Sequence, residues 1–481
     1  MNEVVTDPKN RTVRLLVAIA SHGQKNMGFL RRIIQSYRSM AMDADVVVVS
    51  EAPKDLGPDV QVTVGLPSSN PWSLPFAHKA VFARNVDRYD LFVYSEDDMA
   101  VTEKNIQAFL RVTPALEADE IAGFLRFEAA ESGVLSVPEA HGSAHWRPES
   151  VKRRGEHTIA EFTNEHAGFY ILTQTQLKRA IASGNFLREP YHGRYGLPET
   201  AATDPYTCCG FRKVICISAL DDFLIHHLPN RYVGRLGLPL TAIQEQVRTL
   251  VDICNGTHPA TTLCETEAKV LHGKWSKGYD EERVAEVLEM VPVAARTMLS
   301  IGSGCGETEL ELQRRGVKIV VFPLDSVVGA AAERLGFEVV YGNLNECLDK
   351  LQGRTFDCVL ITNLLHLLPN PWPVLDQSCR LINESGTLIL SGPNFHTVRT
   401  LCKRALKGGD YRKLRSFEQS GIHMLRVGEI ARQIKRSGLE IVARRWYDHA
   451  SARNRFNFRR PWGSFVAENW VLQARRRGAL S

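Results

Sequence analysis

The chain has 481 residues, of which 44% are hydrophobic and 23% are charged, and its formal net charge is +5. These are ordinary values for a globular protein, and the length is enough for two domains that each bury a core. The mild positive charge permits an anionic ligand or a membrane surface. It does not favour nucleic acid as a partner, because a clustered basic stripe would then be expected.

Ten cysteines are scattered along the chain, and Cys208-Cys209 is their one close pair. This spacing predicts neither a zinc site nor a disulfide framework, so a reducing cytoplasm fits best. No run reaches the ~18 apolar residues of a membrane span, and the N-terminus lacks the apolar segment of a signal peptide. We therefore expect a soluble protein, and peripheral association with a membrane stays open.

The N-terminal half begins with a strand, a helix and another strand. The run 13–20 is continuously apolar, residues 27–40 have helical periodicity, and 44–51 is again strand-like. This order predicts an α/β sheet with ligand contacts where its strands end, near Ser21 and Glu51.

A helix over 78–85 leads into a strand over 89–98 that ends in three acids, Glu96, Asp97 and Asp98. Three carboxylates at one strand end repel one another unless a cation lies among them, so the pattern suits a divalent metal with oxygen ligands. A solvated acidic turn is the alternative on these residues alone.

The helix carries Ala83-Arg84-Asn85, and such a helix before an acid-ending strand resembles glycosyltransferases of the GT-A fold. The resemblance implies that the acids hold Mn²⁺ or Mg²⁺ on the diphosphate of a nucleotide sugar. The implied metal ligands are Glu96, Asp98 and His227. The residues implied for nucleotide-sugar binding are Ser21, Glu51, Arg84 and Asp97. Glu96 departs from the family, which has Asp there, and a His226-His227 pair is more often in packing or solvent contact.

Two later segments extend the resemblance. A strand over 166–173 with a helix over 174–183 looks like the elements beside an acceptor pocket, and 218–227 looks like the helix start where inverting enzymes carry an acidic base. By resemblance, Asp221 or Asp222 would deprotonate the attacking sugar hydroxyl. An Asp pair at a helix start is also an ordinary N-terminal cap.

The second half contains a glycine-rich turn. In the stretch 298–307 a buried strand runs into three alternate glycines and then into a helix. The glycines are Gly302, Gly304 and Gly306. They let the backbone approach a ligand, and the helix N-terminus offers free N–H groups. A strand over 318–322 is followed by Asp325, at roughly the spacing of a ribose-binding acid. A nucleoside ligand is predicted.

The spacing of these glycines lacks the third glycine of a dinucleotide-binding turn. The following order of loop, strand, helix start and strand over 341–390 resembles the Rossmann-like class I S-adenosylmethionine-dependent methyltransferases. The resemblance covers about 271–472. Gly392-Pro-Asn394 and the helix over 427–437 look like methyltransferases found with cell-surface polysaccharide enzymes.

This second resemblance implies roles for single residues. The three glycines would line the methionine and ribose of the cofactor, Asp325 would bind the ribose hydroxyls, and Asn343 would lie near the adenine amine. Methyl transfer from a sulfonium needs alignment and removal of the acceptor proton, for which His366 is the base suggested by position. A core or helix-capping histidine is the alternative. Trp275 and Tyr279 lie in a loop that could close over the cofactor, with core packing as the alternative for Trp275.

We therefore predict a GT-A-like domain over 11–235, a connector over 236–270 and a class I methyltransferase domain over 271–481. Residues 265–291 are expected to form a helical lead-in to the methyltransferase. The sequence of the loop expected over 128–161 does not indicate a function for it.

The C-terminal region is rich in arginines and aromatic residues. It could be a solvated face, or it could bind an anionic glycan, a lipid pyrophosphate or single-stranded nucleic acid. The arginines are Arg444, Arg445, Arg453, Arg455, Arg459, Arg460, Arg475, Arg476 and Arg477.

The combined prediction is a bifunctional transferase of glycan or surface polysaccharide biosynthesis. It would transfer sugar from a nucleotide sugar to a glycan or lipid-linked glycan acceptor and methylate a hydroxyl with S-adenosylmethionine. One alternative is a methyltransferase whose N-terminal module only holds the acceptor. Another is a nucleic-acid methyltransferase, for which affinity would fall steeply with salt.

Overall fold

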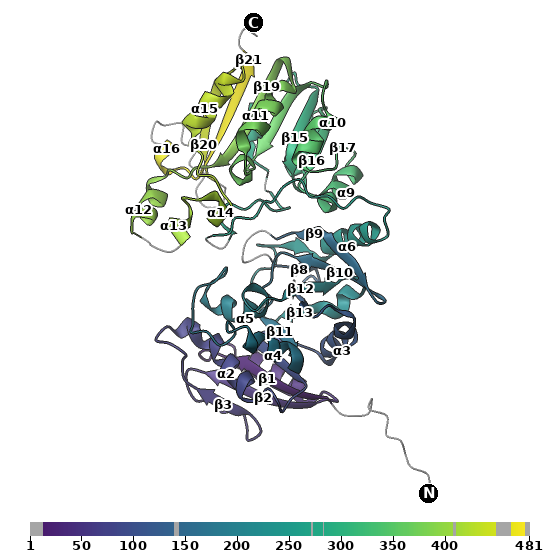
Figure 1. Cartoon of the computed structure of the whole chain (residues 1–481), viewed down its shortest axis with the longest axis vertical. Helices are drawn as coiled ribbons and strands as arrows, with labels where there is room; N and C mark the ends of the chain where they lie inside the picture. The colour runs from purple at the N-terminus through teal and green to yellow at the C-terminus, as the bar shows by residue number, and fades with distance from the viewer. Residues whose placement is uncertain are drawn as a thin grey trace. The chain divides into compact units, whose positions relative to one another are not determined.

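The computed structural model describes residues 13–138, 144–270, 273–281, 283–406, 410–448 and 463–476. The chain divides into two compact units (Figure 1). Unit 1 comprises Met1–His141 and Ser150–Cys254, and unit 2 comprises Gly142–Glu149 and Asn255–Ser481. The helix α6 (Leu240–Cys254), which we expected in a connector, is part of unit 1. Among the described residues, no helix has both the length and the apolar character needed to cross a bilayer.

A five-stranded sheet forms the centre of unit 1, in the order β11-β4-β1-β2-β3. Its strands are β1 (Arg14–Ala20), β2 (Asp43–Ser50), β3 (Gln61–Val64), β4 (Leu91–Glu96) and β11 (Phe169–Thr173). The first four are parallel, and β11 is antiparallel to β4. The α/β sheet expected from the sequence is present. Parallel strands are covered on both faces, which explains why their sequences are continuous apolar runs.

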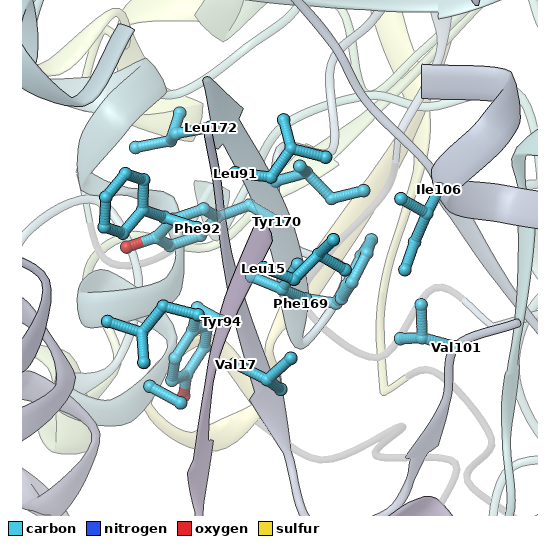
Figure 2. Packing of buried hydrophobic residues seen from close by; sticks show 14 of the residues in the cluster. Leu15, Val17, Leu91, Phe92, Tyr94, Val101, Ile106, Phe169, Tyr170 and Leu172 are labelled. Carbon is cyan, nitrogen blue, oxygen red and sulfur yellow. The ribbon is translucent and has the colours of Figure 1, made fainter. Parts of the chain in front are cut away.

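The core of unit 1 lies on this sheet. Phe92 and Tyr94 of β4 and Tyr170 of β11 are fully buried among aliphatic side chains of neighbouring strands (Figure 2). The helix α1 (Met27–Arg38) contributes buried side chains at helical spacing, from Leu30 to Tyr37. The other helices of unit 1 are η2 (Pro71–Phe76), α2 (Ala77–Arg84), α3 (Glu103–Val112), η3 (Thr113–Ala115), α4 (Gln174–Ala182), α5 (Leu197–Thr207) and η4 (Ile217–Phe223).

Two smaller sheets complete unit 1, in the orders β6-β12-β10-β9 and β14-β8-β7-β13-β5. Their strands are β5 (Met99–Ala100), β6 (Glu120–Ala122), β7 (Leu125–Ala129), β8 (Leu135–Val137), β9 (Trp146–Arg154), β10 (His157–Phe162), β12 (Arg212–Cys216), β13 (Leu224–His227) and β14 (Leu238–Pro239). Of β9, residues 150–154 belong to unit 1. The loop predicted over 128–161 therefore contains strands.

The helix start predicted over 218–227 is wrong beyond its first turn. A 3₁₀ segment, η4, ends at Phe223, and the chain continues as β13. Strand β13 pairs with β7 on one side and with β5 on the other, so its backbone N–H and C=O groups are bonded in a sheet rather than in a helix. His226 and His227 consequently point to opposite faces of a strand.

Unit 2 contains a seven-stranded sheet in the order β17-β16-β15-β18-β19-β21-β20. Its strands are β15 (Thr297–Ser303), β16 (Lys318–Pro323), β17 (Glu338–Val339), β18 (Phe356–Thr362), β19 (Ile382–Pro393), β20 (Leu439–Tyr447) and β21 (Asn469–Arg476). All pairs are parallel except those that β21 makes with its two neighbours. Chain order reverses between β15 and β18, which is where such sheets bind ligands.

Helices connect the strands of unit 2. They are α7 (Ala285–Met290), α8 (Glu307–Arg314), α9 (Ser326–Arg334), α10 (Leu344–Lys350), η6 (Leu365–Leu367), α11 (Pro371–Arg380), α12 (Val398–Leu406), α13 (Asp410–Lys413), α14 (Phe417–Ser420), α15 (Val427–Arg436) and α16 (Gly463–Val466). Among the described residues of the helical lead-in expected over 265–291, the α-helix is α7 (Ala285–Met290). Gly273 in the left-handed region and Gly278 interrupt the preceding stretch, which runs as turns instead.

Candidate functional site

The glycine turn of unit 2 connects β15 to α8 and requires its glycines. Gly302 and Gly306 have φ angles of 79° and 76°, in the left-handed region. A Cβ atom on Gly304 would lie 2.3 Å from the carbonyl oxygen of Tyr279, because that oxygen accepts a hydrogen bond from the Cys305 N–H at 2.7 Å. The turn is thus in close backbone contact with the segment that precedes the sheet.

A cavity of about 800 Å³ opens beside this turn. Its wall is formed by the ends of β18 and β19, by the glycine turn and by the segment 274–281. Among its lining residues are Gly304, Gly306, Thr362, Asn363, Asn394 and Trp275. Small-molecule sites usually measure about 300–1,000 Å³, so this cavity has room for a cofactor and part of an acceptor.

One wall of the cavity carries a hydrogen-bonded group of four side chains. The fully buried Lys277 ammonium donates to Glu281 Oε2 at 2.7 Å and to the Thr362 carbonyl at 2.5 Å. Asn363 Nδ2 lies 3.3 Å from Glu281 Oε1, and Asn363 has a φ of 47°, which is unusual for a residue with a side chain. Such strained positions concentrate at functional sites. Lys277 and Glu281 match no short motif and are not among the residues predicted from the sequence.

Asp325, the predicted ribose-binding acid, is only 3% exposed. Its Oδ1 accepts the Val327 and Val328 N–H groups at 2.8 and 3.2 Å and so caps α9, while its Oδ2 accepts the Tyr279 hydroxyl at 2.5 Å. Burial raises the pKa of Asp325 to about 7, and the bond from Tyr279 opposes that rise. Tyr279 therefore makes the contact expected of a ribose hydroxyl.

A second segment covers the same edge of the sheet. The Leu263 N–H donates to the Leu324 carbonyl at 2.8 Å, the Ser326 N–H donates to Thr261 at 2.9 Å, and the Leu344 N–H donates to Leu263 at 2.9 Å. Asn343, predicted near the adenine, is exposed and caps α10 through the Glu346 N–H at 3.1 Å. Residues 261–263 thus lie along the strand ends where ribose and adenine contacts were expected.

His366 lines the cavity but is 3% exposed. Its Nε2 donates to the Trp275 carbonyl at 2.8 Å, and its ring lies 5.6 Å from that of Phe395. Burial lowers the pKa of His366 to about 4, so the imidazole is neutral at pH 7. These contacts favour the core-histidine alternative, and a catalytic role stays a prediction.

The three acids at the end of β4 in unit 1 have different sets of partners, and the Asn26 amide is shared by Asp97 and Asp98. Asp97 accepts the Ser21 hydroxyl at 2.7 Å on Oδ2 and the Asn26 amide at 2.7 Å on Oδ1. Burial raises the pKa of Asp97 to about 6 despite these bonds. Ser21 and Asp97 meet because β1 and β4 are parallel neighbours that end in register, Ala20 beside Glu96.

Asp98 and Glu96 have basic partners. Asp98 Oδ2 lies 3.5 Å from His227 Nε2 and 3.7 Å from Arg231 Nη2, while Glu96 Oε1 lies 3.6 Å from His166 Nε2. Burial, and then the charge of Asp98, raises the pKa of Glu96 to about 7.

His227, the third implied metal ligand, is held from its other nitrogen, since Nδ1 lies 2.5 Å from Glu128 Oε1. Among the described residues, no group of three or more His, Cys, Asp or Glu is arranged to hold a metal ion. His227 and Arg231 already lie against the Asp98 carboxylate, whereas burial lowers the pKa of His166, the partner of Glu96, well below its usual value. The geometry therefore does not fit the metal site that the resemblance implies.

The remaining predicted residues of unit 1 lie in varied surroundings. Glu51 Oε1 accepts the Gly23 N–H at 2.8 Å at the end of β2, and Arg84 is exposed at the end of α2. Asp221 is exposed. Asp222 forms ion pairs with Lys104 at 2.7 Å and Arg111 at 2.6 Å, which leaves its carboxylate engaged by two cations of α3.

Part of the basic C-terminal region, 449–462 and 477–481, lies outside the described residues, and with it the arginines predicted at 453, 455, 459, 460 and 477. Arg445 of β20 forms an ion pair with Glu289, and Arg476 donates to the Ile382 carbonyl at 3.0 Å. These two arginines are thus engaged within unit 2.

Comparison with known proteins found a family model that matches part of unit 2. Residues 281–472 match the family model described as "Methionine biosynthesis protein MetW". This region is a MetW-like S-adenosylmethionine-dependent methyltransferase. The match does not extend into unit 1, and no curated protein matches the chain.

Solved structures of S-adenosylmethionine-dependent methyltransferases are similar to about two-fifths of the chain. One is from Thermotoga maritima, described as a possible histamine N-methyltransferase, at 14% identity over 40% of this chain and 86% of that one, with a TM-score of 0.31. Another is from Archaeoglobus fulgidus, at 15% identity over 38% and 87%, with a TM-score of 0.30. A third is from Mesorhizobium loti, at 17% identity over 40% and 96%, with a TM-score of 0.30.

Proposed function

We propose that the protein methylates a hydroxyl of a glycan with S-adenosylmethionine in unit 2 and that unit 1 binds, and transfers, the sugar from which that glycan is built. The observation that carries the methyltransferase half is the cavity at the switch point of the seven-stranded sheet, beside the glycine turn of a MetW-like region. The glycines fit a close backbone approach by the cofactor.

The cofactor supplies an electrophilic methyl group, and the protein has to orient the acceptor and accept its proton. Glu281 supports such a role, since Lys277 and Asn363 hold its carboxylate at the cavity wall. His366 is the alternative base that its position suggested.

The sugar-binding half rests on unit 1. Its parallel sheet gathers Ser21, Glu51 and Asp97 at the ends of three strands, where nucleotide ligands of α/β folds bind. The three acids at the end of β4, Glu96, Asp97 and Asp98, are the feature that favours a sugar-transferring site over a purely structural one. An acceptor-holding unit without transfer activity is the second candidate, and the paired state of Asp222 favours it.

The test is transfer of labelled methyl from S-adenosylmethionine to a panel of oligosaccharides, with RNA as a comparison acceptor. Wild type is compared with Glu281→Gln and with Glu289→Gln, an exposed acid on α7 that serves as a control. We expect labelling of glycan and not of RNA, and a loss of about 10²-fold or more in Glu281→Gln alone. Labelling of RNA would contradict the proposed substrate class.

A second assay addresses unit 1. Hydrolysis of nucleotide sugars by wild type, lost in Asp97→Ala/Asp98→Ala with cofactor binding intact, is the result expected of a sugar-transferring site. No hydrolysis by wild type would leave the acceptor-holding role.

A further inference from the structure

Arg126 of β7 carries a buried charge, and among the described residues its Nε and Nη2 have no hydrogen-bonded counter-ion. The residue is 6% exposed. Its guanidinium lies 5.7 Å from the ring of Tyr232, which is a weak partner for a cation. A buried unpaired guanidinium is strongly unfavourable unless a ligand supplies the missing charge.

Arg126 belongs to the acid cluster of unit 1. Side chains two residues apart on a strand share a face, so Arg126 and Glu128 lie on the same side of β7. Glu128 contacts His227, and His227 contacts Asp98. The pairing of β7 with β13, Arg126 beside Ile225, sets this arrangement.

The carboxylates nearby are already used. Glu128 is contacted by His227 Nδ1 at 2.5 Å and accepts the Tyr232 N–H at 2.7 Å, and Asp98 Oδ2 faces His227 and Arg231. Asp98 Oδ1, in contrast, is buried and has no hydrogen-bond partner among the described residues. The cluster therefore combines an unpartnered donor group with an unpartnered acceptor oxygen.

A ligand with anionic oxygens for Arg126 and a hydroxyl for Asp98 Oδ1 satisfies both groups. The side chains of Arg231 and Glu96 are 44% and 29% exposed, so the cluster reaches the surface. A guanidinium matches two phosphate oxygens with parallel N–H bonds, and a carboxylate oxygen accepts a sugar hydroxyl. No divalent cation is required for these contacts.

We propose that Arg126 anchors the diphosphate of a sugar carrier in unit 1 without a divalent cation, while Asp98 Oδ1 accepts a hydroxyl of the same ligand. The proposal rests on the sugar-binding half of the proposed function and is independent of methyl transfer. Arg126, which lies outside every predicted motif, would then bind the diphosphate that the sequence resemblance assigned to a metal ion.

The test is calorimetric titration of the full chain with inorganic pyrophosphate, UDP, GDP and farnesyl diphosphate, in EDTA and in MnCl₂. The variants are Arg126→Met, Arg126→Lys and the control Arg38→Met, whose arginine pairs with Asp59 on the surface of the same unit. We expect binding in EDTA that is about 10- to 100-fold weaker in Arg126→Met, partly restored in Arg126→Lys and unchanged in the control. Preference for UDP or GDP over farnesyl diphosphate identifies a nucleotide carrier, and the reverse identifies a lipid carrier.

Thermal unfolding without ligand separates binding from a structural role. Arg126→Met should unfold at a higher temperature than wild type, because it removes an unpaired buried charge, whereas loss of a structural arginine would lower that temperature.

Three results would overturn the proposal: binding that Arg126→Met leaves unchanged, no binding of any probe by wild type, or binding that needs Mn²⁺ and is lost in Asp98→Asn but not in Arg126→Met. The last result would restore the metal site. Diphosphate binding in a chain that transfers no methyl group would overturn only the methyltransferase half.

Discussion

Replacing Tyr279 by Phe is expected to tighten cofactor binding while it destabilises the free protein. The substitution deletes the hydroxyl that donates to Asp325 Oδ2 and keeps the buried ring. A hydrogen bond to a charged group contributes about 1.5–3 kcal/mol, so the free energy of unfolding should fall by about that amount. In the variant, the ribose hydroxyl expected at the same oxygen no longer competes with the Tyr279 hydroxyl. A net gain of about 1–2 kcal/mol in the free energy of cofactor binding corresponds to about 5- to 30-fold tighter binding.

The assay is calorimetric titration with S-adenosylhomocysteine, paired with urea unfolding of the ligand-free protein. Because the Tyr279 bond lowers the pKa of Asp325, the variant should have a higher pKa than wild type, and the titration is done above about pH 8 to keep the carboxylate ionised. Tyr447→Phe, which alters another buried tyrosine of unit 2, is the control. Equal or weaker binding by Tyr279→Phe would refute the competition between Tyr279 and the ribose.

Two further predictions concern buried charges. Burial raises the pKa of Asp325 to about 7 in the fold, from the ordinary Asp value of about 3.9 in an unfolded chain. Its contribution to stability is therefore complete below about pH 4 and is lost as pH rises through about 7. The free energy of unfolding of Asp325→Asn should therefore rise relative to wild type as the pH increases from about 4 to about 7, by up to about 4 kcal/mol, and the difference should stay constant above pH 7. Urea unfolding across this range measures the difference. A difference that does not change between pH 4 and pH 7 would contradict the prediction. Lys79 and Asp204 form a buried ion pair with side chains 3% and 0% exposed, so Lys79→Met should lower the free energy of unfolding by about 3–5 kcal/mol. Lys79→Met/Asp204→Leu should recover much of that loss in the same urea assay, and an additive effect of the two substitutions would count against the pairing.

Features set by single strands and their ends were predictable from the sequence. Apolar runs predicted both parallel sheets. Ser21 and Asp97, each directly after a strand, lie together because neighbouring parallel strands end at one edge. The glycine turn was predictable because only glycine suits its backbone.

Features that depend on distant pairing were not predictable. Glu128 and His227 are 99 positions apart in sequence, and only the pairing of β7 with β13 brings them together. The same pairing turned a predicted helix start into a strand, since tertiary context overrides local propensity. The contact of Tyr279 with Asp325 needs a turn whose course no periodicity specifies. Arg126 carried no signal, because an isolated arginine in a strand is ordinarily paired.

The measurement that tests the account most directly is calorimetric titration of S-adenosylhomocysteine into wild type, Gly306→Ala and Gly316→Ala. Both glycines have left-handed φ angles, 76° and 88°, so both substitutions impose similar backbone strain, but only Gly306 lines the cavity. We predict one site per chain, with binding weakened at least about tenfold in Gly306→Ala and unchanged in Gly316→Ala. Absence of binding in folded wild type, or equal effects of the two substitutions, would contradict a cofactor site at the glycine turn.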